Sequence, residues 1–257
     1  MSIKKVIAGT VAVLAMGAFS AASAQVMSIG GGAFFSGGFG GGVTGDWIDF
    51  DGSYRYEESY TMKMPFIGGG INVFFDATYV EASLGLLFAG GTWAEEYEYK
   101  DFYNGNLIGY GKGNDDNAKS SFTAFNMGAL GKYPIYFGSM TVFPAFGIQY
   151  QMVLSGKTNF DYGDGDTEEM KWDGKQTCEM YGGDIECWGN PKASDFNTLW
   201  FKFGGGLDYD LSETMFLRSS LLYGIRLSNK IEKDWEDGGD TRLGHGLDIR
   251  VGVGFRL

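Results

Sequence analysis

The last eleven residues alternate strictly between two kinds of side chain, and this period constrains the fold more than any other feature. Every second position from Leu247 to Leu257 holds an apolar residue, and the positions between are charged residues or glycine. Side chains two residues apart lie on the same face of a β-strand. This segment is therefore predicted to be a strand with one apolar face and one charged or bare face.

The same period recurs along the chain, which predicts eight strands. It is clear over residues 80–88, 125–129, 142–152, 199–209 and 215–227, and weaker over about 27–40 and 62–75. The gaps between strands alternate in length. Three are short, at 76–78, 131–134 and 210–213, and four are long, at about 43–61, 93–119, 155–197 and 229–242. The sequence thus predicts an all-β fold, an eight-stranded antiparallel up-and-down barrel with both chain ends at the short-turn end.

Charge is distributed unevenly between gaps and strands. The four long gaps contain 26 of the 32 acidic residues and carry a net charge of −15. Charged residues within the clear strands all lie opposite the apolar stripe. They are Glu81, Lys202, Asp208, Arg218, Arg226, Asp248, Arg250 and Arg256.

Two kinds of barrel fit this pattern. In a soluble lipocalin-type barrel the apolar face points inward, whereas in an outer-membrane barrel it meets lipid. Glycine is abundant on the polar face, and aromatic residues gather near both strand ends. Tyr79, Tyr209 and Phe216 are expected at the short-turn end, and Trp93, Tyr150 and Tyr223 at the other, as two girdles would require. We therefore favour a transmembrane barrel with extracellular loops and periplasmic turns, and keep an exported soluble ligand-binding barrel as the third interpretation.

The N-terminus indicates export. Lys4 and Lys5 precede an apolar run, and Ala22-Ser23-Ala24 has the pattern that signal peptidase cleaves. Residues 1–24 are predicted to be a signal peptide and residues 25–257 the barrel domain. Without the two lysines, 18 basic and 32 acidic residues give the mature chain a net charge of −14. Nucleic-acid partners need basic surfaces, so they are excluded as a class.

The terminal pattern also carries a family resemblance. Val251, Val253, Phe255 and Leu257 are similar to the C-terminal strand signal of outer-membrane β-barrels, although that signal usually ends in Phe or Trp. The mature chain resembles the small eight-stranded barrels of the OmpA, OmpX and OmpW type. The resemblance implies location in the cell outer membrane, contact with its lipid and recognition by the barrel-assembly machinery. It implies no particular activity.

An eight-stranded barrel is just wide enough for its side chains to fill the interior. We therefore predict that the inward charged residues form an ion network that plugs the lumen. The alternative is a narrow or gated path for small solutes, as similarity to OmpW would imply. With a filled lumen, the loops would carry the function, through a structural or surface-interaction role with an extracellular or host partner. Their interleaved acidic and aromatic residues suit either binding or packing among the loops.

The longest gap contains two further candidate features. Cys178 and Cys187 are the only cysteines, and in an exported protein so close a pair is predicted to form a disulfide, with free thiols or metal ligation as alternatives. Four acidic residues could offer oxygen ligands to Ca²⁺, but the glycine of the EF-hand pattern is missing. These weak candidates are Asp164, Asp166, Glu168 and Glu169.

Catalysis is not predicted. A Ser-His-acid arrangement would need His245, the only histidine, which by parity lies on the apolar stripe at the long-loop end. The glycine-rich segment from Ser28 to Val43 lacks both phosphate-loop patterns, so no nucleotide cofactor is expected. We predict instead that it is the first strand, and that its glycines leave room for arginine side chains in the lumen.

Overall fold

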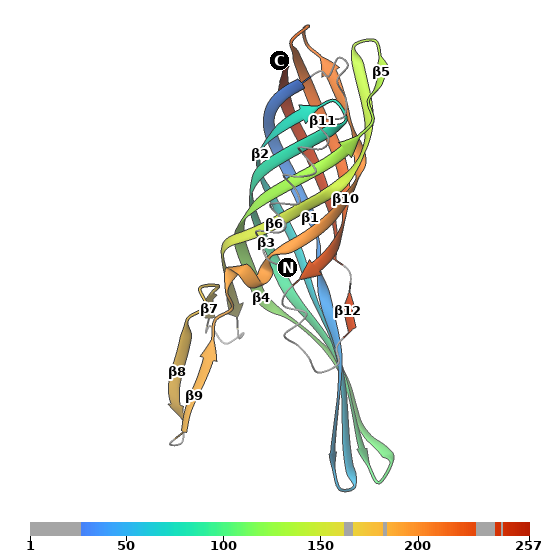
Figure 1. Ribbon diagram of the computed structural model, residues 1–257. Coiled ribbons are helices and arrows are strands. Elements are labelled where there is room, and N and C mark those ends of the chain that lie inside the picture. The colour runs from blue at the N-terminus through green and yellow to red at the C-terminus, as the bar shows by residue number, and fades with distance from the viewer. Residues whose placement is uncertain (1–26, 162–166, 182–183, 230–239, 243) are drawn as a thin grey trace.

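Eight antiparallel strands close into a barrel in the computed structural model, which describes residues 27–161, 167–181, 184–229, 240–242 and 244–257 (Figure 1). Each strand of the ring pairs with two neighbours, because β1 pairs with β13 and β6 pairs with β10. The eight-stranded antiparallel up-and-down barrel predicted from the sequence is confirmed. Around the ring the strands are β1 (Met27–Asp51), β2 (Tyr54–Ala77), β3 (Val80–Tyr103), β4 (Asn106–Lys132), β6 (Met140–Asp161), β10 (Thr198–Asp210), β11 (Met215–Asn229) and β13 (His245–Arg256).

The first barrel strand, β1, begins at the short-turn end, and the last barrel strand, β13, ends there. The backbone N–H of Leu257 donates to the carbonyl of Met27 at 2.9 Å. One short turn differs from the prediction of 131–134, because the chain continues beyond it into β5 (Ile135–Phe137), which pairs back on β6. The reversal occurs after Phe137 at Gly138, whose φ of 61° favours glycine.

Residues 43–61 and 93–119 were predicted to be loops, but they are largely regular strand. Beyond the barrel wall, β1, β2, β3 and β4 continue as a four-stranded sheet, which Figure 1 shows projecting from the long-loop end. The β3–β4 hairpin turns at Asn104 and Gly105, with φ of 49° and 78°. Two consecutive positive φ values are typical of the tight turns that match strand twist, and this explains why the strands continue to the tip. We call residues 44–63 and 94–115 the projecting sheet.

The third and fourth long gaps also contain regular structure. β7 (Thr167–Lys171) pairs with the end of β6, and β8 (Gln176–Tyr181) forms a separate hairpin with β9 (Asp184–Gly189). A 3-10 turn, η1 (Ala193–Phe196), then leads back into the ring, and β12 (Asp240–Arg242) pairs with β1. Among the described residues, no helix is both long and apolar enough to span a bilayer.

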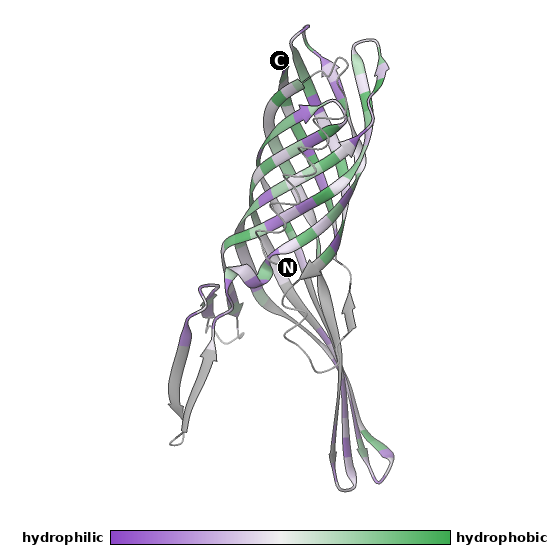
Figure 2. Cartoon of the chain, viewed as in Figure 1, coloured by the Kyte–Doolittle hydropathy of each residue, from purple (hydrophilic) through white to green (hydrophobic). Residues whose placement is uncertain are grey.

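Strand parity separates the two faces of the wall. Large apolar side chains are exposed along the barrel strands, and Figure 2 shows hydrophobic and hydrophilic residues alternating along these strands. Ile71 and Phe146, for example, are 65% and 64% exposed. Inward positions carry the buried charged residues together with aromatic rings and glycines. An inward apolar face, as in a lipocalin-type barrel, is thus not what the structure shows.

Candidate functional site in the barrel interior

Arg218 is the centre of an ion cluster at the short-turn end of the lumen. Its Nε and Nη2 donate to the two carboxylate oxygens of Asp208, at 2.7 and 2.6 Å. Nη1 donates to Glu81 at 2.8 Å, and Nη2 also lies 2.6 Å from Asp76. A planar guanidinium can serve several carboxylates at once because its five N–H groups point in fixed, different directions. One arginine therefore joins three strands across the interior.

Two members of this cluster were missed by the sequence analysis. Asp76 and Lys132 form a buried ion pair, yet both fell in predicted turns, at 76–78 and 131–134. The strands extend to Ala77 and Lys132, so both residues keep the inward parity of their strands. The signal was available, since Asp76 lies two positions after the inward Phe74.

A second group of buried charges lies further along the lumen. Lys202 Nζ donates to Asp248 at 2.9 Å, and Ser36 Oγ donates to the other oxygen of Asp248 at 2.7 Å. Arg250 links the two groups, because Nη2 lies 3.3 Å from Asp248 and Nη1 lies 3.8 Å from Glu81. Arg250 also donates to Gln149 at 2.8 Å.

Together the two groups balance in charge. Buried charges destabilise a fold unless they are paired, so equal numbers matter in so small an interior. We call these residues the lumen network. Its four carboxylates belong to Asp76, Glu81, Asp208 and Asp248, and its four cations to Lys132, Lys202, Arg218 and Arg250.

The structure places the other two predicted members elsewhere. Arg256 pairs with Asp210 at the rim of the short-turn end, where both side chains are partly exposed. Arg226 is buried near the opposite end, beside the pocket described below. Of the eight residues predicted to form an ion network, six thus belong to the lumen network.

Phenylalanine rings fill the space around Arg218. Phe216, which was predicted to lie in the aromatic girdle at the short-turn end, is one of these rings and is buried inside the barrel. The guanidinium carbon of Arg218 lies 4.5 Å from the ring centre of Phe74 and 5.1 Å from those of Phe143 and Phe216. Cations are attracted to ring faces at such distances. The rings are accommodated by glycines, since a Cβ on Gly254 would lie 2.1 Å from Phe216 and one on Gly30 would lie 2.3 Å from Phe74. The prediction that the glycines of residues 28–43 make room for arginine side chains is therefore wrong at Gly30, because a phenyl ring occupies the room.

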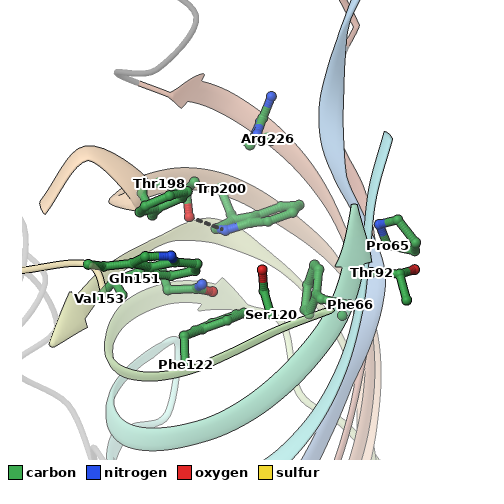
Figure 3. A pocket seen from close by; sticks show the side chains of 13 residues that line it. Pro65, Phe66, Thr92, Ser120, Phe122, Gln151, Val153, Thr198, Trp200 and Arg226 are labelled. Carbon is green, nitrogen blue, oxygen red and sulfur yellow. Dashed lines mark hydrogen bonds between the residues drawn. The ribbon is translucent and has the colours of Figure 1, made fainter. Parts of the chain in front are cut away.

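An aromatic pocket lies at the long-loop end of the lumen (Figure 3). It encloses about 570 Å³ of space not filled by protein atoms, part of it open to solvent. Trp172 stacks on Phe196 with ring centres 3.8 Å apart and on Phe122 at 6.0 Å. Phe66 meets Trp200 edge-on at 6.3 Å. We call this feature the mouth pocket. The sequence analysis did not find it, because Trp172 and Phe196 come from the predicted loop at 155–197.

His245 lies where the sequence placed it, exposed on the outer wall at the end of β13. Its Nδ1 is 2.7 Å from the hydroxyl of Tyr223. No acidic partner or nucleophilic hydroxyl other than this phenol is found in contact with it among the described residues.

The candidate Ca²⁺ ligands and the two cysteines of the predicted loop at 155–197 lie only partly within the described residues. Asp164 and Asp166 lie outside the described residues, whereas Glu169 pairs with Lys157 at 2.5 Å, and Glu168 precedes it on β7. In the described part of the chain, no three His, Cys, Asp or Glu side chains are placed so that they could hold a metal ion together. Cys178 and Cys187 are direct register partners in the β8–β9 hairpin, although their side chains lie outside the described set.

The projecting sheet carries its charges in cross-strand pairs. Lys112 bonds to Glu98 at 2.7 Å and Lys100 approaches it at 3.2 Å, and these two contacts lower the pKa of Glu98. The same bond to Glu98 raises the pKa of Lys112. Burial and a hydrogen bond to Glu58 raise the pKa of Tyr56 to about 12.

Comparison with known proteins gives structural similarity only. No family model matches the chain, and no curated protein matches its sequence. Among solved structures, Neisserial surface protein A is 8% identical with a TM-score of 0.36, covering 90% of this chain and 97% of its own. The outer membrane protease OmpT of Escherichia coli is 7% identical with a TM-score of 0.30, covering 92% and 98%. The N-terminal β-barrel domain of Pseudomonas aeruginosa OprF is 15% identical with a TM-score of 0.25, covering 89% and 99%. Such values carry no functional argument.

Proposed function

We propose that this chain is a non-enzymatic outer-membrane β-barrel whose lumen is closed by side chains and whose projecting sheet acts at the cell surface. The observation that carries the proposal is the charge-balanced lumen network. Its buried pairs cross the interior between strands far apart in the sequence, such as Arg218 and Asp76. A continuous water path would have to pass through these pairs, and breaking them leaves buried charges without partners.

The outer wall supports the membrane part of the proposal. A soluble protein rarely exposes contiguous apolar patches, whereas a barrel in lipid needs an apolar band around its waist. Closure of the ring pairs the backbone groups that lipid would otherwise leave unsatisfied. Tyr79 and Tyr133 meet at the short-turn end with ring centres 6.3 Å apart, where one aromatic girdle is expected. Trp93, expected in the other girdle, has a side chain outside the described set.

Biogenesis follows from the same proposal. Residues 1–24, which lie outside the described residues, would direct export. Val251 and Phe255 point outward on β13 and are 50% and 51% exposed, and Leu257, directly after the strand, is 75% exposed. Together with Val253 they would present an apolar stripe to the barrel-assembly machinery. Outer-membrane lipid is the expected surrounding, and an extracellular or host molecule is the proposed partner of the projecting sheet.

The β8–β9 hairpin is proposed to carry a disulfide between Cys178 and Cys187. Directly opposed residues of antiparallel strands have Cβ atoms about 4.5–5.5 Å apart, close to the spacing that a disulfide needs. Closing so short a loop stabilises the hairpin by about 2–3 kcal/mol. Alkylation of the unfolded, unreduced protein tests this pairing, since incorporation of two alkyl groups would exclude the disulfide.

Two experiments test the proposal. Gel mobility of the detergent-extracted protein, with and without boiling, is expected to show a heat-modifiable band, and a single mobility would argue for the soluble alternative. Recording from purified protein in a planar bilayer is expected to show no steady conductance. Regular conductance steps would instead support the narrow channel or transporter for small solutes.

A further inference from the structure

We propose that the mouth pocket binds a small, flat aromatic molecule that carries one neutral hydrogen-bonding group. This site goes beyond the proposed function, since it would operate whether or not the projecting sheet has a partner. The walls supply the first reason. Phe66, Phe122 and Trp200 face a common space (Figure 3). Trp172 and Phe196 line the same space. A ring compound can stack on such walls or meet them edge-on, gaining more than burial alone provides.

The pocket is partly open to solvent at the long-loop end of the lumen, so a ring compound can reach it from that side. The pocket is closed toward the lumen network. Along β3, Leu87 lies between Glu81 of the network and Gly91 of the pocket, and it is fully buried. Ala124 is equally buried on the adjacent β4. The pocket is therefore a cup that retains a ligand and does not lead to the other end.

A buried amide supplies the second, independent reason. Gln151 lines the pocket and is only 7% exposed. Its side chain has no hydrogen-bond partner among the described residues, and Figure 3 shows its amide directed between the rings of Trp200 and Phe122. Burying an amide without a partner is unfavourable, so such a group is normally satisfied by water or a ligand. An amide can both donate to and accept from a phenol or a similar neutral group.

The neighbouring polar groups show why Gln151 is singled out. Thr198 accepts a bond from the Trp200 indole N–H at 2.8 Å, and Ser120 shares one with Thr158 at 2.9 Å. These hydroxyls are already engaged within the wall. Arg226, which also lines the pocket, has an interaction of its own as well. Gln151 is thus the neutral polar contact that would distinguish a hydroxylated ring from a bare hydrocarbon.

The test compares naphthalene with 2-naphthol by equilibrium dialysis against the full-length mature protein in phosphatidylcholine vesicles, with protein-free vesicles as the blank. Saturable binding of both is expected, with 2-naphthol bound about fivefold more tightly, as one neutral hydrogen bond would give. Gln151→Leu should remove that preference while leaving naphthalene affinity unchanged. Ser219→Leu, the same kind of polar-to-leucine change on the outer wall, should alter neither.

A second variant locates the ligand. Val153 is buried in the pocket wall, so Val153→Trp should fill the space and lower the affinity for both probes at least tenfold. Heat-modifiable mobility of each variant shows that it is folded. Binding no greater than that of the blank, binding unaffected by Val153→Trp, or a preference that survives Gln151→Leu would each overturn the assignment. Tighter binding of n-decanol than of 2-naphthol would also overturn it, since the site would then prefer alkyl chains to aromatic rings. Failure here leaves the heat-modifiability and conductance results untouched, so the two proposals are separable.

Discussion

Arg218 is the residue on which most of the lumen depends. It holds three carboxylates, and both it and they are almost fully buried. Removing one member of a buried pair costs more than the pair contributes, because the remaining charges stay in a medium of low dielectric constant. Here the remaining carboxylates would outnumber the nearby cations.

We therefore expect Arg218→Met to lower the free energy of unfolding by about 3–5 kcal/mol. Arg256→Met is the matched control, since Arg256 pairs with Asp210 at the partly exposed rim, and it should cost about 0–1 kcal/mol. Urea unfolding of protein refolded into vesicles measures both. Equal losses in the two variants would contradict a central role for Arg218.

The interior glycines provide a second prediction at this scale. A Cβ on Gly254 would meet the ring of Phe216, whereas a Cβ on Gly32 would lie 2.1 Å from the backbone carbonyl oxygen of Val251. Gly254→Ala should destabilise the barrel by about 1–3 kcal/mol, the usual cost of overpacking. The cost should shrink in a Phe216→Leu background, because the ring is the obstacle.

Gly32→Ala is the control for this pair. Its obstacle is backbone, so shortening Phe216 should not relieve it. The double-mutant cycle is measured by the same urea unfolding. Additivity of Gly254→Ala and Phe216→Leu would show that the ring is not what requires glycine.

At the scale of elements, the projecting sheet is held by pairing at its surface as well as by its backbone ladder. Tyr56 stacks on Tyr99 with ring centres 6.2 Å apart, and Lys112 and Lys100 converge on Glu98. Such exposed pairs contribute little individually, so most of the order comes from four strands pairing in register. We propose that this sheet is where charged and aromatic side chains meet a partner.

The pH dependence of this element can be predicted in sign. The pKa of Glu98 is lowered in the folded sheet, chiefly by its bond to Lys112. The pair therefore stabilises the sheet above the unfolded pKa of Glu98, and the contribution is lost as the pH falls through the lower, folded value. Lys112→Gln should raise the pKa of Glu98 toward its ordinary value, as observed in an NMR titration of the Glu98 carboxylate. An unchanged pKa would mean that the two side chains do not meet in solution.

At the scale of the whole molecule, the barrel strands expose apolar side chains on the outside and bury charged side chains inside. We call the exposed apolar surface of the barrel wall the apolar belt. Ile71 is 65% exposed near the middle of β2, and Tyr136 is 67% exposed near the short-turn end on β5. If the belt lies in lipid, the cost of a charge must depend on depth, because hydrocarbon excludes charge and the interface does not.

We expect Ile71→Lys to destabilise the protein in vesicles by about 2–4 kcal/mol and Tyr136→Lys by about 0–1 kcal/mol. The measurement is the urea midpoint of each variant in the same vesicles. A soluble barrel would tolerate both changes equally, since both side chains would meet water. Equal small effects would thus contradict membrane insertion.

Much of the barrel could be predicted from the sequence because side-chain period is a local property. Each strand's alternation identifies its two faces without knowledge of its neighbours, and the even series of strands with alternating gap lengths indicates an up-and-down ring. The extension of β1 to β4 beyond the wall was harder to see, since residues 43–61 and 93–119 are rich in acidic residues. Pairing across four strands, which no single segment reveals, is what orders them.

The sequence by itself determined which residues face inward, and the tertiary structure decided which of them meet. Arg218 lies 142 positions from Asp76 and 137 from Glu81, and only the register and closure of the ring bring them within 3 Å. The mouth pocket likewise requires Trp172 and Phe196 to fold back over the barrel from a segment without clear periodicity. The face of the sheet on which a side chain lies follows from the geometry of one strand. Contact between side chains across the lumen depends on the curvature and stagger of all eight strands.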